Sequence, residues 1–210
     1  MIEPKIKHIA IAGNIGAGKT TLATLLGKNF NWEVQYEEVE SNPYLEDFYL
    51  DMPRWSFNLQ VYFLNSRFKQ IYAIQKGGET VVQDRTIYED CEIFAPNLYN
   101  MGLMSERDYL NYRDLFQTLS TKITPPDLLI YLRASIPKLV EQIQKRGRDY
   151  EENLRLDYLK KLNELYEKWI LSYSDGKLLI VDIDKFDFAN NQDHLAEVIN
   201  LIRGNLHGLF

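Results

Sequence analysis

The sequence predicts an α/β fold with a five-stranded parallel sheet and helices on both faces. Short apolar runs have the length of buried strands, longer segments repeat their apolar residues with helical spacing, and the two kinds of segment alternate. Strands that are apolar on both sides are typical of parallel sheets covered by helices. We expect one domain over residues 1–210, because no linker, repeat or low-complexity tract interrupts this pattern.

Five segments are expected to form the strands. The first is followed directly by glycine, and the fourth follows the chain-breaking pair Pro125-Pro126. Buried strands of an α/β sheet are short and carry few charges. The segments are Ile6–Ala12, Glu33–Tyr36, Thr80–Gln83, Leu128–Leu132 and Lys177–Val181.

The helices are expected from apolar spacing and from residues that start or stop helices. Asn42 before Pro43 predicts a helix start, Ser105 with Asp108 forms a capping-box pattern, and Ser135 is expected to cap another helix. The expected helices are 20–30, 42–49, 54–75, 87–99, 105–121, 135–145, 156–169 and 189–202.

Composition restricts the classes of partner. Lys and Arg total 24 and Asp and Glu total 30, so the formal charge is −6. This balance argues against binding nucleic acid or an anionic membrane through bulk charge. Cys91 is the one cysteine, which excludes an internal disulfide and is usual in a reducing compartment. With no signal-peptide pattern and no apolar run of membrane-spanning length, we expect a cytoplasmic protein.

A glycine-rich segment after the first strand carries the most specific chemistry. Gly13-Asn14-Ile15-Gly16-Ala17-Gly18-Lys19-Thr20 matches G-x-x-x-x-G-K-[ST] between a strand and a helix. Its backbone N–H groups and the helix N-terminus can hold phosphate oxygens. Lys19 is expected to reach the β- and γ-phosphates and Thr20 to ligate Mg²⁺. The fold is therefore expected to be of the P-loop NTPase type.

The loop alone does not separate GTPases, motor ATPases, nucleotide-dependent switches and small-molecule kinases. A GTPase should carry Asn-Lys-x-Asp after a later strand, and the sequence has none. A motor ATPase normally ends a strand in adjacent acids, whereas Val81-Val82-Gln83-Asp84-Arg85 provides one. A small-molecule kinase is favoured, and a switch remains the alternative from another class.

Charged pairs follow the second and third expected strands. Glu37-Glu38 and Asp84-Arg85 should meet beside the phosphate loop, since ligands bind beyond the carboxyl ends of parallel strands. A carboxylate there can take the proton of an attacking hydroxyl. Arg85 can hold that carboxylate or the phosphoryl group, and Asp84 can complete the Mg²⁺ shell. Either pair alone would more often be a solvated strand end.

Two further segments have a functional interpretation if the chain contains a phosphate loop. Arg146-Gly147-Arg148 lies between expected helices and predicts a lid around residues 145–152 whose guanidinium groups close over the phosphate. Gln60 and Arg67 lie nearly two turns apart on one face of an aromatic-rich helix, where they could recognise a planar heterocycle. Without the phosphate loop, a basic helix end and a polar stripe would be the better interpretations.

At this point the chain resembles the deoxyribonucleoside kinase family over nearly its whole length. Besides the phosphate loop, the resemblance rests on motifs in family order. They are Glu37-Glu38-Val39-Glu40, Tyr49, Arg54-Trp55-Ser56-Phe57-Asn58-Leu59-Gln60, Arg67, Asp84-Arg85-Thr86-Ile87-Tyr88-Glu89-Asp90, Phe94 and Arg146-Gly147-Arg148-Asp149-Tyr150-Glu151.

For phosphoryl transfer from ATP, the resemblance implies that Glu37 is the catalytic base for the sugar 5′-hydroxyl and Arg85 the arginine beside it. Asp84 matches the acid near Mg²⁺, and Arg146 and Arg148 match the lid arginines. Glu38 stands where the family commonly has proline, so it is a rival base. Glu37 is preferred because it lies nearer the strand end.

For the nucleoside, the resemblance implies that Tyr49 and Glu151 hold the 3′-hydroxyl, with Glu151 preferred over its acidic neighbours by its spacing from Arg148. Gln60 matches the residue that contacts the base through two hydrogen bonds. Phe94 matches the aromatic residue stacked on the base, and Trp55 the lining of the same pocket.

Arg67 and Asp90 match a pair found in relatives that accept purines or cytosine. An aspartate accepts a hydrogen bond from an exocyclic amine, which favours adenine, guanine or cytosine over thymine. The short chain and Asn42-Pro43-Tyr44-Leu45 resemble bacterial deoxyadenosine and deoxyguanosine kinases. We expect a deoxyadenosine kinase, with deoxyguanosine and deoxycytidine as alternatives and a nucleoside-monophosphate kinase as a more remote one. The resemblance also implies a homodimer.

Overall fold

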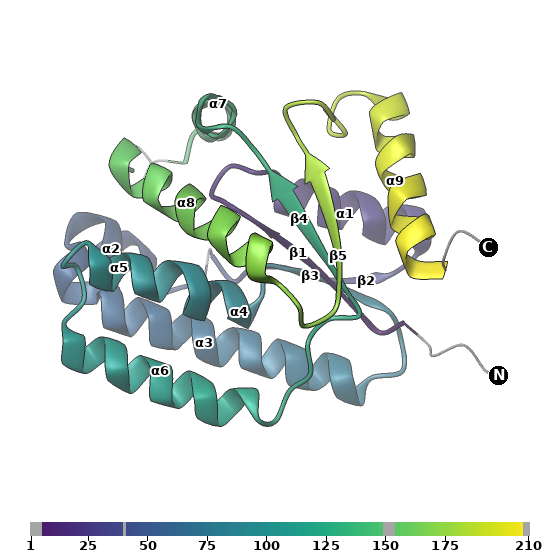
Figure 1. Cartoon of the computed structure of the whole chain (residues 1–210). Coiled ribbons are helices and arrows are strands. Elements are labelled where there is room, and N and C mark those ends of the chain that lie inside the picture. Colours follow the sequence, from purple (N-terminus) through teal and green to yellow (C-terminus); the bar gives the residue numbers. More distant parts are fainter. Residues whose placement is uncertain (1–5, 40, 149–153, 208–210) are drawn as a thin grey trace.

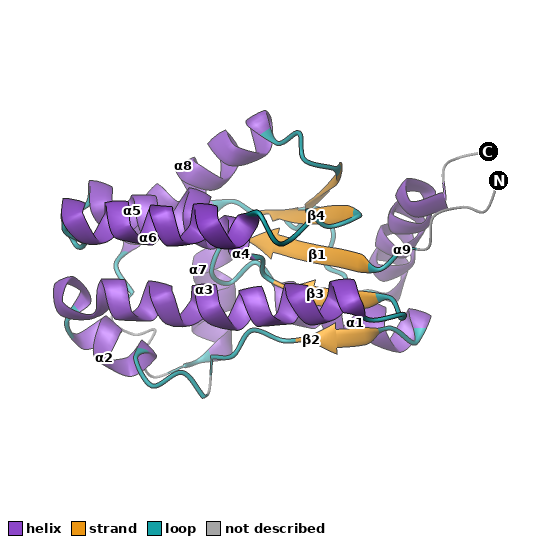
Figure 2. Ribbon diagram, turned by 90° about the horizontal axis from the view of Figure 1, so that it is seen from below, coloured by secondary structure: helices purple, strands orange, loops and turns teal. Residues whose placement is uncertain are grey.

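The computed structural model describes residues 6–39, 41–148 and 154–207. It confirms the predicted α/β fold, with one parallel sheet and helices on both faces (Figures 1 and 2). The strands lie in the order β2-β3-β1-β4-β5. They are β1 (His8–Gly13), β2 (Glu33–Gln35), β3 (Val81–Asp84), β4 (Leu128–Arg133) and β5 (Lys177–Asp182).

Nine α-helices and one π-helix are described in these ranges. None of them combines the length and the apolar run that a membrane span needs. They are α1 (Lys19–Phe30), α2 (Leu45–Leu50), α3 (Met52–Lys76), α4 (Ile87–Glu89), the π-helix η1 (Asp90–Phe94), α5 (Ala95–Asn100), α6 (Glu106–Ser120), α7 (Ile136–Arg146), α8 (Leu156–Ser172) and α9 (Gln192–His207).

The central strand shows how the sheet is covered. Ile9 and Ile11 belong to the core that contains α1 and α9, whereas Ala10 and Ala12 belong to the core that contains α3 and α8. Side chains of a strand alternate between the two faces, so both halves of β1 must be apolar. All four residues are fully buried. This double burial explains why the sequence shows an apolar run rather than an alternating one.

The parallel order brings the functional segments to one edge of the sheet. Ile11 of β1 is paired with Asp84 of β3, and β2 is the other neighbour of β3. The phosphate loop after β1, Glu37 after β2 and Arg85 after β3 therefore emerge side by side. The sequence predicted this meeting from the direction of the strands.

Two helix starts differ from the prediction. The side chain of Asn42 accepts a hydrogen bond from the Tyr44 N–H (2.9 Å) and forms a turn, so α2 begins only at Leu45. The long helix begins at Met52, earlier than expected, because Asp51 caps it by accepting from the Arg54 N–H. By contrast, the predicted caps at Ser105 and Ser135 are confirmed.

The expected helix 87–99 is also interrupted. Thr86 and Glu89 form a capping box that starts α4, after which the chain widens into the π-helix η1. A π-turn holds more residues than an α-turn and is frequent at functional sites. The last helix begins at Gln192 rather than near Ala189.

A buried imidazole lies where β1 enters the sheet. His8 is 4% exposed, and its Nε2 shares a 2.9 Å hydrogen bond with Gln83 Oε1 of β3. Burial lowers the pKa of His8 to about 4. The folded state thus requires the neutral imidazole.

We expect His8 to make stability fall at mildly acidic pH. The unfolded imidazole gains a proton near its ordinary pKa of 6.5, whereas the folded one resists protonation until about pH 4. Between pH 7 and pH 5 the wild type should lose about 2 kcal/mol more unfolding free energy than His8→Gln. Denaturant titrations at both pH values test this, and equal losses would contradict it.

Candidate active site

A cavity of about 780 Å³ opens at the carboxyl edge of the sheet. The phosphate loop, the segment after β2, helices α2 and α3, and the start of α8 all contribute to its wall. Predicted site residues in its lining are Ile15, Gly16, Gly18, Lys19, Thr20, Glu37, Tyr49, Gln60, Arg67, Asp84, Arg85, Asp90, Phe94, Arg146 and Arg148. One cavity therefore joins most of the residues that the sequence singled out.

The phosphate loop needs its glycines. Gly16 and Gly18 have φ values of 84° and 85°, a region that side chains disfavour. A Cβ on Gly16 would also lie 2.8 Å from the Leu139 carbonyl oxygen of α7. The Asn14 side chain turns away from the cavity and donates to the Leu159 carbonyl of α8 (3.2 Å). Thus Gly13, Asn14 and Ala17 shape the loop without lining the cavity.

Lys19, the first residue of α1, is 6% exposed. Its ammonium group donates to the carbonyl oxygens of Gly13 (2.9 Å) and Asn14 (3.0 Å). Burial, together with the nearby charge of Arg85, lowers the pKa of Lys19 to about 8. The amine thus retains its charge at neutral pH but is close to losing it.

Thr20 and Asp84 lie together at the side of the loop. The Thr20 hydroxyl donates to Asp84 Oδ2 (2.5 Å). The other carboxylate oxygen, Oδ1, is buried and has no hydrogen-bond partner within the described part of the chain. Burial raises the pKa of this carboxyl group. An oxygen with this environment is suited to a hard cation such as Mg²⁺ or to a water molecule bound to it.

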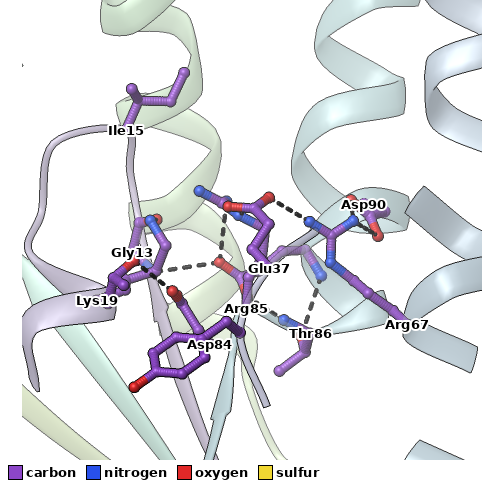
Figure 3. A network of polar contacts seen from close by, with 12 residues as sticks. Gly13, Ile15, Lys19, Glu37, Arg67, Asp84, Arg85, Thr86 and Asp90 are labelled. Carbon is purple, nitrogen blue, oxygen red and sulfur yellow. Dashed lines mark hydrogen bonds and ion pairs between the residues drawn. The ribbon is translucent and has the colours of Figure 1, made fainter. Parts of the chain in front are cut away.

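Glu37 lies between two guanidinium groups (Figure 3). Its Oε1 is 2.5 Å from Arg67 Nη2 and 3.0 Å from Arg85 Nε. Burial by itself would raise the pKa of Glu37, but the charges of Arg85 and Arg67 outweigh it and lower the pKa to about 2. The carboxylate is consequently ionised at any physiological pH.

Arg67 also makes the pair that was expected to recognise the base. Its Nη1 donates to both oxygens of Asp90, at 2.7 and 2.6 Å. Burial raises the pKa of Asp90 to about 7 against the attraction of Arg67. The guanidinium also lies over the Phe63 ring, 4.4 Å from its centroid. One arginine thus contacts both the expected base-reading carboxylate and the expected catalytic carboxylate.

Gln60 and Phe94 face the same cavity from α3 and η1. Gln60 is 2% exposed, and its Oε1 lacks a hydrogen-bond partner among the described residues. Trp55 does not line the cavity. Its ring packs 5.8 Å from that of Tyr44 and lies under the Arg54 guanidinium.

The expected lid is described only in part. Helix α7 ends at Arg146, and Gly147 follows with a φ of 63°, a left-handed conformation that suits glycine at a helix end. Arg146 and Arg148 line the cavity together with Lys145 and Gln142. Glu151 and its acidic rivals lie outside the described residues, so the expected contact to the 3′-hydroxyl is not placed.

Sequence reasoning missed two residues of this network. Glu89 is fully buried and contacts the Gly13 N–H, the Arg85 guanidinium and the Tyr166 hydroxyl. Tyr166 on α8 also accepts a hydrogen bond from Arg85 Nη1 (2.7 Å). The capping-box spacing from Thr86 to Glu89 was available in the sequence. Tyr166, in contrast, looks like any other aromatic residue on an apolar helix face.

A phosphate-loop motif that shares a cavity with an ionised carboxylate and several cations is the arrangement expected of a phosphotransferase. The comparison with known families agrees. The sequence matches the family described as deoxynucleoside kinase over residues 9–207. The chain therefore belongs to the deoxynucleoside kinase family, and it is an enzyme that uses a nucleotide phosphate donor.

Relatives support the family over nearly the whole chain. The sequence is 48% identical to a deoxyadenosine kinase from Dictyostelium discoideum, over 91% of this chain and 77% of the relative. It is 39% identical to a deoxyadenosine/deoxycytidine kinase from Bacillus subtilis, over 97% and 95% of the two chains. A solved deoxyadenosine kinase from M. mycoides superposes with a TM-score of 0.84 at 30% identity, covering 94% of this chain and 99% of that one.

We expect binding of the nucleotide phosphate donor, tested with ATP, to take up about half a proton per site at pH 8, because Lys19 is about half protonated there and phosphate oxygens restore its charge. Calorimetric titrations in buffers of different ionisation enthalpy measure this uptake. Lys19→Arg should abolish it, since a guanidinium stays charged. Lys28→Arg, an exposed change on the same helix, should leave it intact. Equal binding heats in all buffers for the wild type would contradict the prediction.

Proposed function

We propose that this enzyme transfers the γ-phosphate of ATP to the 5′-hydroxyl of deoxyadenosine, with Mg²⁺, in purine salvage. The observation that carries the proposal is that Glu37, held by two arginines, shares one cavity with the phosphate loop and with Gln60. A small acceptor bound along Gln60 would present a hydroxyl group between Glu37 and the loop.

The recognition of the base is supported by two kinds of polar group. Gln60 offers an amide with an unused oxygen, which suits the mixed donor and acceptor edge of a nucleobase. Asp90 offers carboxylate oxygens that accept from an exocyclic amine, as found on adenine, guanine and cytosine. Phe94 provides an aromatic face for stacking. Thymine lacks the amine and is disfavoured.

Adenine is preferred because relatives named deoxyadenosine kinase are among the most similar proteins. The B. subtilis relative also acts on deoxycytidine, and another relative from that organism is a deoxyguanosine kinase at 36% identity. Deoxycytidine and deoxyguanosine are therefore the competing acceptors.

Glu37 acts as an acceptor rather than as a strong base. A carboxylate with a pKa of about 2 does not remove a hydroxyl proton from the ground state. It can orient the 5′-hydroxyl by accepting its hydrogen bond and take the proton as the bond to phosphorus forms. Glu38 is less suited, since it is exposed and its described partner is the Tyr62 hydroxyl at 3.4 Å.

The metal would be held by Thr20 and Asp84. Mg²⁺ usually takes one or two protein oxygens and completes its shell with phosphates and water. The unpartnered Oδ1 of Asp84 beside the Thr20 hydroxyl fits this pattern. When bound, the metal would supply charge neutralisation at the β- and γ-phosphates.

The cations stabilise the transferring group. Lys19 approaches it from the start of α1, Arg85 from the end of β3, and Arg146 and Arg148 from the end of α7. If the expected lid, residues 145–152, closes over the bound phosphates, it would exclude water and so favour transfer to the nucleoside over hydrolysis.

We also propose a cytoplasmic homodimer. The dimer is supported by the aromatic content of α3 together with the exposed apolar side chains Tyr72, Leu110 and Leu115 on α3 and α6, and the cytoplasm by the single, buried cysteine. Such exposed apolar residues are frequent at interfaces between copies of one chain.

Glu37→Gln should lower kcat by about 10²-fold, because the amide orients the hydroxyl but does not take its proton. Deoxyadenosine should still bind with similar affinity. Steady-state kinetics and calorimetry measure the two effects, and Glu38→Gln is the matched control with near-normal kcat. A nearly unchanged kcat in Glu37→Gln, with a loss in the control, would make Glu38 the base.

A competition panel of the four deoxynucleosides with ATP should give the highest kcat/KM for deoxyadenosine and the lowest for thymidine. Asp90→Asn should lower the ratio of kcat/KM for deoxyadenosine to kcat/KM for thymidine by about 10-fold or more, the usual contribution of a hydrogen bond to a charged group. If no deoxynucleoside stimulated ATP consumption, a nucleotide-dependent switch would replace the kinase. A preference for monophosphate acceptors would favour a nucleoside-monophosphate kinase.

A further inference from the structure

We propose that Glu89, together with Tyr166, is a positioning residue that fixes Arg85 relative to the phosphate loop. The inference rests on the proposed role of Arg85 in stabilising the transferring phosphoryl group. Neither Glu89 nor Tyr166 lines the cavity, so both act through Arg85 and Gly13.

The two oxygens of Glu89 have separate partners. Oε2 accepts the Thr86 N–H (2.7 Å) and completes the capping box of α4. Oε1 accepts the Gly13 N–H (3.2 Å) and the Tyr166 hydroxyl (2.8 Å), and lies 3.4 Å from Arg85 Nη1. Capping the start of α4 requires only one of the two carboxylate oxygens of Glu89. The other oxygen contacts groups from β1, from α8 and from the connection between β3 and α4, and that arrangement is not required by capping.

Arg85 is fixed at both ends of its guanidinium. Nε faces Glu37 (3.0 Å), whereas Nη1 donates to the Tyr166 hydroxyl (2.7 Å) and faces Glu89. The guanidinium carbon lies 4.6 Å from the centroid of the Phe94 ring. The backbone of Arg85 has a φ of 72°, which is rare outside glycine.

The shared oxygen of Glu89 fixes the distance between the start of the phosphate loop and the Arg85 guanidinium. Gly13 begins the loop that holds the phosphates, and Arg85 carries the charge that meets them. Because both contact the same carboxylate oxygen, the loop cannot move relative to the arginine without breaking a buried, charge-assisted hydrogen bond. Phosphoryl transfer depends on such fixed placement of charge.

Tyr166 is a rigidly packed side chain that holds both Arg85 and Glu89. It is fully buried, its ring is stacked on Tyr131 (centroids 5.8 Å apart) and it meets Phe94 edge to ring. The hydroxyl both accepts from Arg85 and donates to Glu89. Removing the hydroxyl alone would remove the shortest hydrogen bond to Arg85 Nη1 while leaving the ring packing and the cap of α4 in place.

Tyr166→Phe and Glu89→Gln test the inference in the full-length enzyme. Each should lower kcat by about 10-fold while the KM for deoxyadenosine changes by less than about 2-fold, the pattern of an interaction realised mainly in the transition state. The double variant should lose little more than either single one, because both changes release the same guanidinium. The chain offers a matched control in Tyr131 and Glu167, a neighbouring pair joined by a 2.9 Å hydrogen bond. Tyr131→Phe and Glu167→Gln should keep kcat near normal.

Denaturant titrations accompany the kinetics, because Glu89→Gln also weakens the cap of α4. If Glu89→Gln does not fold, Tyr166→Phe carries the test on its own. A normal kcat in Tyr166→Phe overturns the inference, as does equal loss in the control pair. The variant Arg85→Lys shows whether a negative result refutes only the positioning role of Tyr166 and Glu89, or the proposed role of Arg85 in phosphoryl transfer. A large loss in Arg85→Lys with normal Tyr166→Phe refutes the positioning role alone, whereas a normal Arg85→Lys refutes the role of Arg85 itself.

Discussion

The attraction between Glu37 and two guanidinium groups is the interaction on which the rest of the site depends. A carboxylate removed from water is costly, and here Arg67 and Arg85 keep it ionised. Each arginine must in turn be held. Arg67 is fixed by Asp90 and Arg85 by Glu89, so carboxylates and guanidinium groups alternate from Asp90 through Glu37 to Glu89. The sheet supplies the frame, since parallel strands deliver these groups to one edge.

The alternating carboxylates and guanidinium groups also connect the proposed base-binding residue with the proposed catalytic residue. Arg67 contacts the carboxylate proposed to read the base and the carboxylate proposed to accept the hydroxyl proton. If a nucleobase displaces Asp90, the guanidinium that holds Glu37 is displaced with it. In such an arrangement, discrimination between nucleosides is expressed in turnover as well as in binding.

The sequence was informative where function follows from local pattern or strand direction. The phosphate loop is a contiguous motif, and the meeting of Glu37 with Arg85 follows from parallel strands. Glu89 acts through contacts with the start of the loop and with α8, which are brought together only by the fold, and Tyr166 carries no local signal. Trp55 shares its helix with Gln60, but small differences of rotation around a helix decide which side chain reaches a cavity.

The π-helix has a consequence for how this site can change. A wide turn accommodates one residue more than an α-turn, and here Asp90 and Phe94, at its two ends, both line the cavity. The extra residue is held within the turn, so the helical segments before and after it keep the relative orientation of a regular helix. Loss of one residue from the middle of the turn would therefore change the spacing between Asp90 and Phe94 without rotating α5. The turn offers a place where chain length can change next to the cavity while the surrounding helices stay packed.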